Sequence, residues 1–368
     1  MKMKKAVALS TVIGVAIAGI AFISPASAEP VSNSYVLVGS DTLQDSSNAL
    51  LNGTSATGPL VHVLSTTASS IGSFDAFGST AIQTKTGGVF FGRPSGSGAG
   101  VTALRASITG ATYSGNSAVP AKVISGQVDI ARSSSGPSTN ANAAGLLVYI
   151  PYARDAVAYA YKGGSAAWAN ITTAQLKQIY DGTLTTIDSL PIHPRLPQTL
   201  SGTRKFFLTA IGEGGVSAPA VSDVGNVTAE NDATVLGDGD IIPFSVANWV
   251  AQANNVTGVN TTSTVGVALG TPITGTVPFT GTAPALVPNA TFYSDGTFGR
   301  DTYLVVEYAR VNPSSATYDS GLAALVDPTV SGSLTSFETF ASTPGAVKKK
   351  LGFLAPSTST AQRAYTTL

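Results

Sequence analysis

The chain has 368 residues, no cysteine, a formal net charge of zero and only 11% charged residues. The lack of cysteine excludes disulfides, thiolate metal sites and a lipid anchor on cysteine. The balanced charge gives no sign of a nucleic-acid surface, and the length exceeds what one hydrophobic core usually supports, so we expect two lobes.

The chain begins with a pattern typical of a secretory signal. Three lysines within residues 1–5 precede an apolar run over 6–23, and the small residues Ala26-Ser27-Ala28 follow. We therefore predict a signal peptide at 1–28 and a secreted, extracellular or periplasmic protein without a lipid anchor. Because the apolar run is long for a signal, an uncleaved anchor is the alternative. Cleavage of this signal would remove three lysines, so we expect the remaining chain to be slightly acidic.

Short strands, small polar loops and helices alternate along the first half of the chain. The apolar patterns predict strands at 35–39, 60–64, 87–92 and 128–136, and helices over 43–51 and 101–110. Residues 65–87 are rich in Ser, Thr and Gly and suggest an irregular insertion. Residues 147–163 are apolar throughout and predict a long extended segment.

The second half begins with the clearest helix of the sequence. In ITTAQLKQIYDGT, Thr172 or Thr173 can cap the helix, and Leu176, Ile179 and Tyr180 form its apolar face. Further segments follow in chain order. They are a polar turn leading into a helix at 198–212, a turn and helix at 238–255, a strand-and-turn insertion at 255–292, a strand at 298–311, and helices at 319–326 and 334–341.

This alternation predicts an α/β protein of two lobes joined by crossing strands. We place lobe one at 29–150 and 298–368, and lobe two at 151–297.

Four loops that lead from a strand or turn into a polar segment carry Ser, Thr and Gly. They lie at 39–42, 95–100, 132–136 and 201–203. Ligands of α/β sheets bind where strands end and helices begin, and uncovered N–H groups and hydroxyls at helix N-termini bind anions. The four loops together predict one shared anion site, whereas four ordinary helix caps are the alternative.

Catalytic motifs are missing. His62 and His193 have no partners at metal-ligand spacing, no G-x-S-x-G motif occurs, and GSGAG at 96–100 lacks the last glycine of a dinucleotide motif. Asp238 and Asp240 are typical of a solvated turn. We expect no enzyme activity, no metal and no cofactor.

Five motifs, in this order, resemble the phosphate-binding proteins of ABC importers, which have the two-lobed periplasmic binding protein fold. They are LVGSDT, SGSGAGV, VDIARSS, ITTAQLKQIYDGT and SGTRKFF. The resemblance covers about residues 35–250 and implies an oxyanion held between the lobes by N–H groups, hydroxyls, an arginine and a carboxylate. It places the following residues in the site: Ser40, Asp41, Thr42, Leu43, Ser97, Gly98, Ser201, Gly202 and Thr203.

Two departures from the family pattern concern charge. Ser133-Ser134 stands where the family has a Ser-Asp pair whose carboxylate accepts the proton of phosphate, so the preference for phosphate is weakened. Asp41 is the candidate replacement, although it is equally well explained as a helix cap.

The family's arginine falls near Pro197 in this chain. Arg132, Arg154 and Arg204 are the candidates to replace its guanidinium. For Arg154, which is followed by Asp155, an ordinary surface ion pair is the alternative.

The resemblance implies a binding protein for phosphate or a similar oxyanion. We expect a monomer that delivers its ligand to the membrane subunits of an ABC importer and binds no nucleic acid. The alternatives are a secreted surface or matrix protein that has lost the ligand, and a phosphatase, which the missing motifs disfavour.

Overall fold

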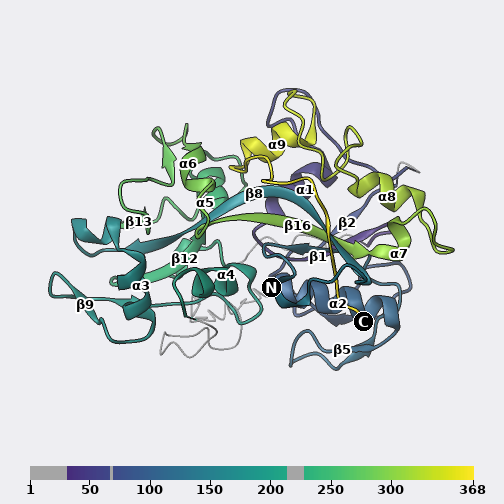
Figure 1. Ribbon diagram of the computed structural model, residues 1–368, viewed down its shortest axis with the longest axis horizontal. Coiled ribbons are helices and arrows are strands. Elements are labelled where there is room, and N and C mark those ends of the chain that lie inside the picture. Colours follow the sequence, from purple (N-terminus) through teal and green to yellow (C-terminus); the bar gives the residue numbers. More distant parts are fainter. Residues whose placement is uncertain (1–30, 67–68, 214–227) are drawn as a thin grey trace, which may run out of the picture.

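The computed structural model describes residues 31–66, 69–213 and 228–368. The predicted signal peptide lies outside these residues. Two groups of helices and strands are joined by the strands β8 (Leu147–Lys162) and β16 (Gly299–Glu307), which run from one group into the other (Figure 1). The expected α/β fold with two lobes and crossing strands is confirmed.

A single sheet extends through both lobes. Its strands follow the order β11-β12-β8-β16-β7-β1-β2, and β13 and β17 also pair with β8. In lobe one, the described elements are β1 (Val36–Gly39), α1 (Gln44–Asn52), β2 (Gly72–Ser73), β3 (Ala81–Ile82), β4 (Phe91–Gly92), α2 (Ser97–Thr109), β5 (Thr112–Tyr113), β6 (Lys122–Val123), β7 (Ile130–Ser133), α7 (Tyr308–Val311), α8 (Ser320–Val326), α9 (Pro344–Lys350) and β17 (Gln362–Ala364). In lobe two they are α3 (Thr173–Tyr180), β9 (Thr186–Ile187), β10 (Leu190–Pro191), β11 (His193–Pro194), α4 (Gly202–Ala210), β12 (Asp240–Ser245), α5 (Val246–Ala253), β13 (Val267–Gly270), β14 (Phe279–Thr280), β15 (Val287–Pro288) and α6 (Ala290–Tyr293).

The sheet of lobe one is buried on both faces. Along β1, Leu37 contacts the core on one face, whereas Val36 and Val38 contact the core on the other. This follows from the two-residue period of a strand. Strand β1 is parallel to β7 and β2, and β7 is antiparallel to β16. The carboxyl ends of β1 and β7 therefore lie at one edge, facing lobe two.

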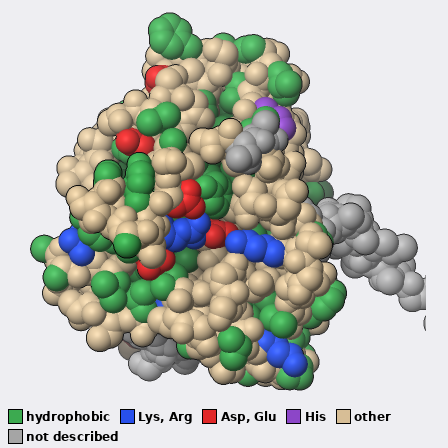
Figure 2. Space-filling model, turned by 90° about the vertical axis from the view of Figure 1, so that its right-hand side faces the viewer, with side chains coloured by type: hydrophobic (Ala, Val, Ile, Leu, Met, Phe, Trp, Pro, Cys, Tyr) green, Lys and Arg blue, Asp and Glu red, His purple; other side chains and the backbone are tan. Residues whose placement is uncertain are grey.

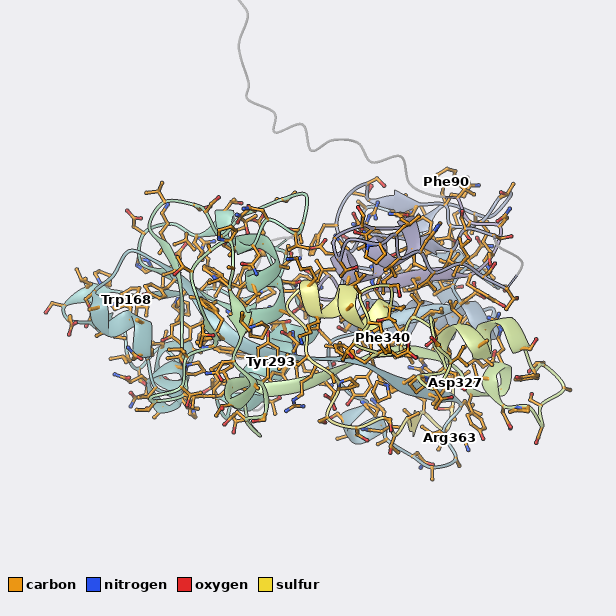
Figure 3. The ribbon with its side chains drawn as sticks, turned by 90° about the horizontal axis from the view of Figure 1, so that it is seen from above. Phe90, Trp168, Tyr293, Asp327, Phe340 and Arg363 are labelled. Carbon is orange, nitrogen blue, oxygen red and sulfur yellow. The ribbon has the colours of Figure 1, made fainter. Side chains whose placement is uncertain are left out.

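Lobe two packs its helices around a core of its own. Helix α3 begins at a capping box in which Thr172 and Gln175 satisfy each other's backbone N–H groups, and Leu176, Ile179 and Tyr180 are buried in the core as expected. Figure 3 shows Trp168 of this core far from the labelled residues of lobe one. Because β8 and β16 run through both lobes, the lobe boundaries given above remain predictions.

The crossing strands carry two adjacent ion pairs. The register pairs Asp155 with Arg300 and Arg154 with Asp301. Neighbouring residues of a strand point to opposite faces, so the two pairs lie on opposite sides of the crossing. Arg154 also donates to the carbonyl of Tyr293, 2.6 Å away, which Figure 3 places near the middle of the molecule.

Several segments differ from the sequence prediction, and one of them is the end of the strand predicted at 298–311, which forms the helix α7. Residues 60–64 form no strand, because Val61 pairs only with Thr54 in an isolated bridge. Residues 334–341 form no helix, because hydroxyls such as that of Thr335, which donates to Val326 O, hold the segment on the end of α8. Residues 240–245, predicted as a turn, form the strand β12 with Pro243 inside it.

Lobe one depends on close contact between α2 and β1. A Cβ on Gly100 would lie 2.6 Å from Gly39 Cα and 3.2 Å from Val38 O, both backbone atoms. We therefore expect Gly100→Ala to lower the free energy of unfolding by about 1–3 kcal/mol, as overpacking does. Urea unfolding measures this change.

Gly258→Ala is the matched control, because a Cβ there meets no atom within 4 Å. We expect it to change stability by less than about 0.5 kcal/mol. Equal stability of the two variants would contradict the close contact.

Candidate functional site

Two helix N-termini face each other across the lobe boundary. In lobe one, β1 ends at Gly39 and the loop Ser40-Asp41-Thr42 leads into α1. In lobe two, Ser201 caps α4 by accepting the N–H of Arg204 at 3.0 Å. The Thr42 and Thr203 hydroxyl oxygens are 3.3 Å apart, so the two loops touch. The predicted convergence of these two loops is present in the structure.

The carboxylate of Glu230 lies between the two loops and is 1% exposed. Its Oε1 accepts the N–H of Thr42 at 3.3 Å, the hydroxyl of Ser40 at 3.4 Å, and the hydroxyl of Thr42. Its Oε2 accepts the N–H of Thr203 at 3.2 Å and the hydroxyl of Ser201. Five donors from two lobes thus surround one carboxylate. We call this set, Ser40, Thr42, Ser201 and Thr203, the anion cradle.

Arg300 supports the cradle from the crossing strands. Its Nη2 donates to the hydroxyl oxygens of Thr203 at 2.8 Å and Thr42 at 3.3 Å, and to Asp155 at 2.8 Å. Asp155 in turn accepts the hydroxyl of Ser245, 3.0 Å away. The Nη1 of Arg300 is buried and has no hydrogen-bond partner among the described residues. The site therefore contains a guanidinium that is paired with Asp155 and that has one nitrogen without a hydrogen-bond partner among the described residues.

Asp41 and Glu230 form a buried acidic pair. Asp41 Oδ2 accepts the backbone N–H of Glu230 at 2.9 Å. Burial, and then the negative charge of Glu230, raise the pKa of Asp41 well above its usual value. Burial opposes ionisation of Glu230 too, but Asp41, the charge of Arg300 and the hydroxyls of Ser201 and Thr42 bring its pKa below its usual value. The opposite directions of the two shifts favour Asp41 over Glu230 as the place of a proton in this pair.

A second contact joins the lobes beside the cradle. Ser97 Oγ and Ser134 Oγ are 3.1 Å apart, and a Cβ on Gly202 would lie within 2.4 Å of both. Gly98 donates its N–H to Leu200 O across the same boundary at 3.1 Å. A cavity of about 240 Å³ opens here. Its lining includes Ser97, Gly98, Ser133, Ser201, Gly202 and Lys205.

The three candidate arginines make other contacts. Arg132 is fully buried in lobe one and donates to the carbonyls of Ser40 and Phe74. Arg154 makes the ion pair with Asp301, and Arg204 donates to the carbonyl of Pro197. The guanidinium that bonds the cradle threonines is that of Arg300, and the ligand-binding role expected of Arg132, Arg154 or Arg204 stays a prediction.

Leu43 and Ser133, two further predicted residues, make contacts other than with the Glu230 carboxylate. The side chain of Leu43 is buried in the core of lobe one, and the amide that donates to Glu230 is that of Thr42. The hydroxyl of Ser133 donates to Ser135 O at 2.7 Å within its own loop.

Sequence reasoning missed Glu230 and Arg300. The sequence around Glu230 carries no local signal of its position in the site. Arg300 is one polar residue at the start of a strand, and only the register of β16 against β8 brings it opposite Asp155. The position of Asp155 in the apolar β8 segment was the available signal, because a buried carboxylate needs a partner of opposite charge.

Within the described ranges, no group of three or more His, Asp or Glu residues is placed to hold a metal ion. The helices described there are also too short or too polar to cross a membrane.

The proton on Asp41 predicts a pH dependence of stability. A raised pKa in the folded state stabilises the protein fully below the unfolded pKa of about 3.9, and this contribution is lost as the pH rises through the folded pKa. Asn at this position carries no titrating proton and can still accept the N–H of Glu230. We therefore expect Asp41→Asn to gain stability relative to wild type above about pH 4, by up to about 1.4 kcal/mol per pH unit.

Urea unfolding at a series of pH values measures this difference. Asp238→Asn is the control, because the side chain of Asp238 is 89% exposed, and its difference from wild type should hardly change with pH. A constant difference between Asp41→Asn and wild type would contradict the assignment of the proton.

Comparison with solved structures identifies the fold. The structure is similar to an ABC-type phosphate transport receptor from Vibrio cholerae, with a TM-score of 0.51 and 16% identity, covering 88% of this chain and 100% of that chain. It is also similar to a phosphate-binding protein from Stenotrophomonas maltophilia, with a TM-score of 0.49 and 14% identity over 89% and 91% of the two chains. At 16% identity, the similarity to the Vibrio receptor establishes the fold alone.

No curated protein matches the chain. The family model of the PBP superfamily domain matches residues 53–324. This range includes α4, Glu230 and Arg300 and covers most of the chain. The protein therefore belongs to the PBP superfamily.

Proposed function

We propose that this protein is an extracytoplasmic binding protein that holds one small oxyanion, with phosphate as the first candidate, in the anion cradle. The observation that carries the proposal is the convergence of five donors from both lobes on a single carboxylate. Such a set of N–H groups and hydroxyls at two helix N-termini is suited to any oxyanion of similar size.

The unused Nη1 of Arg300 supports the same proposal. A carboxylate has two oxygens, whereas a tetrahedral oxyanion has four and can accept more donors. A guanidinium is well suited to such an anion. The buried donor thus has a use in a complex with phosphate that it lacks with Glu230 in place.

Binding in this site rests on local donors. Figure 2 shows mostly uncharged side chains on the face of lobe one that is turned to the viewer, with only a few lysines and arginines among them. The chain as a whole has equal numbers of acidic and basic residues. We therefore expect no strong attraction of anions over long distances. We propose an ABC importer as the recipient of the ligand, as for the Vibrio receptor.

A second candidate function is a secreted surface or matrix protein that binds no solute. The presence of Glu230 in the cradle favours it, because a filled cradle does not need an external anion. Titration calorimetry with phosphate, sulfate and arsenate separates the two candidates. We expect heat of binding with at least one of these anions, and no heat with any of them would support the second candidate.

A variant of the cradle locates the binding. Thr42→Val keeps the size of the side chain and deletes the hydroxyl that lies between Glu230, Thr203 and Arg300. We expect it to weaken binding of the anion by about tenfold, the effect of losing one hydrogen bond to a charged group. Thr102→Val, on the exposed side of α2, is the matched control. Equal affinities of the two variants would place the binding outside the cradle.

A further inference from the structure

The two oxygens of Glu230 serve different lobes. Oε1 accepts donors from Ser40 and Thr42 of lobe one, and Oε2 accepts donors from Ser201 and Thr203 of lobe two. The carboxylate therefore bridges the lobes in the way that an oxyanion in the cradle would. Each helix N-terminus receives a negative charge, which is the stabilising arrangement.

The backbone on both sides of the carboxylate is fixed as well. The N–H of Glu230 donates to Asp41 of lobe one at 2.9 Å. The carbonyl of Asn231, the next residue, accepts Gln252 Nε2 of helix α5 at 2.7 Å, and Gln252 Oε1 accepts the N–H of Thr261 at 2.8 Å. These hydrogen bonds fix the backbone of residues 230–231. They therefore hold the Glu230 side chain in its position in the cradle.

Positive groups offset the charge of the Glu230 carboxylate. The charged groups that act on it are Arg300 from the crossing strands and Asp41 from lobe one. Asp155 is paired with Arg300, and the two helix N-termini supply further positive potential. A buried carboxylate with this many donors is a stable arrangement, whereas an empty cradle would leave buried donors without partners.

On the basis of the proposed function, we propose that Glu230 is an internal ligand of the anion cradle, which holds the two lobes closed without solute and which a free oxyanion must displace. Glu230 therefore sets the concentration at which the protein takes up its solute. A group on the same chain competes at an effective concentration of about millimolar or more. The apparent Kd of the solute equals its intrinsic Kd divided by the fraction of molecules whose cradle is free.

The first measurement is calorimetric titration of phosphate into wild type and Glu230→Ala, both dialysed free of oxyanions. If the internal ligand occupies the cradle in about 90% of molecules, its removal tightens phosphate binding about tenfold. We expect at least this gain. Glu213→Ala is the matched control, because Glu213 forms an ion pair with the exposed Lys177 on lobe two, and it should bind as wild type does. Equal phosphate affinities of wild type and Glu230→Ala would overturn the proposal.

The second measurement is small-angle scattering without solute. We expect wild type and Glu213→Ala to be closed, and Glu230→Ala to have a larger radius of gyration that decreases when phosphate is added. Equal radii of all three proteins without phosphate would overturn the internal ligand. This readout does not depend on solute binding by wild type: expansion of Glu230→Ala with no heat from any oxyanion would support the internal ligand and refute the proposed function.

Glu230→Gln covers the case in which the alanine variant does not fold. It keeps the size of the side chain and loses its charge, so we expect changes in the same direction and of smaller size. Glu230→Gln with the affinity and radius of wild type would overturn the proposal.

Discussion

A buried negative charge between the two lobes is the constraint on which the site depends. The donors around it come from loops that are far apart in the sequence, near residues 40 and 201. Those donors repel one another unless an anion lies among them, because helix N-termini carry partial positive charge. In this structure Glu230 supplies the anion. The closed arrangement of the lobes and the ionised state of this side chain therefore support each other.

The crossing strands make this arrangement possible. Strands β8 and β16 pass through both lobes and place Arg300 opposite Asp155 at the boundary. Arg300 bonds to one threonine from each lobe, Thr42 and Thr203, so a residue of the shared scaffold fixes the relative position of both loops. Asp155 holds the guanidinium and also accepts the N–H of Ala247 at the start of α5, at 3.0 Å. Removing either partner of this buried pair would leave an uncompensated charge.

Local signals made much of the fold predictable. Helix α3 follows directly from the cap at Thr172 and the spacing of its apolar residues, both of which act within one or two turns. The loops of the cradle were also recognisable, because Ser201 lies at the N-terminus of an amphipathic helix.

The predictions that failed involve contacts between residues far apart in the sequence. The segment at 334–341 has helical spacing, but the hydroxyl of Thr335 bonds to the carbonyl of Val326 at the end of α8. Nothing local places Glu230 in the cradle or Arg300 behind it, since both depend on the packing of whole lobes.

The charge changes at two positions are physically linked. The family pattern has a carboxylate where this chain has Ser134, and that side chain lies against Gly202, next to the Ser201 that bonds Glu230. A carboxylate at 134 would bring a second negative charge to the buried site beside that of Glu230, and like charges at short range in a protein interior are costly. Burial, together with the charge of Glu230, already raises the pKa of Asp41. The neutral Ser134 therefore adds no further negative charge to the buried surroundings of Glu230.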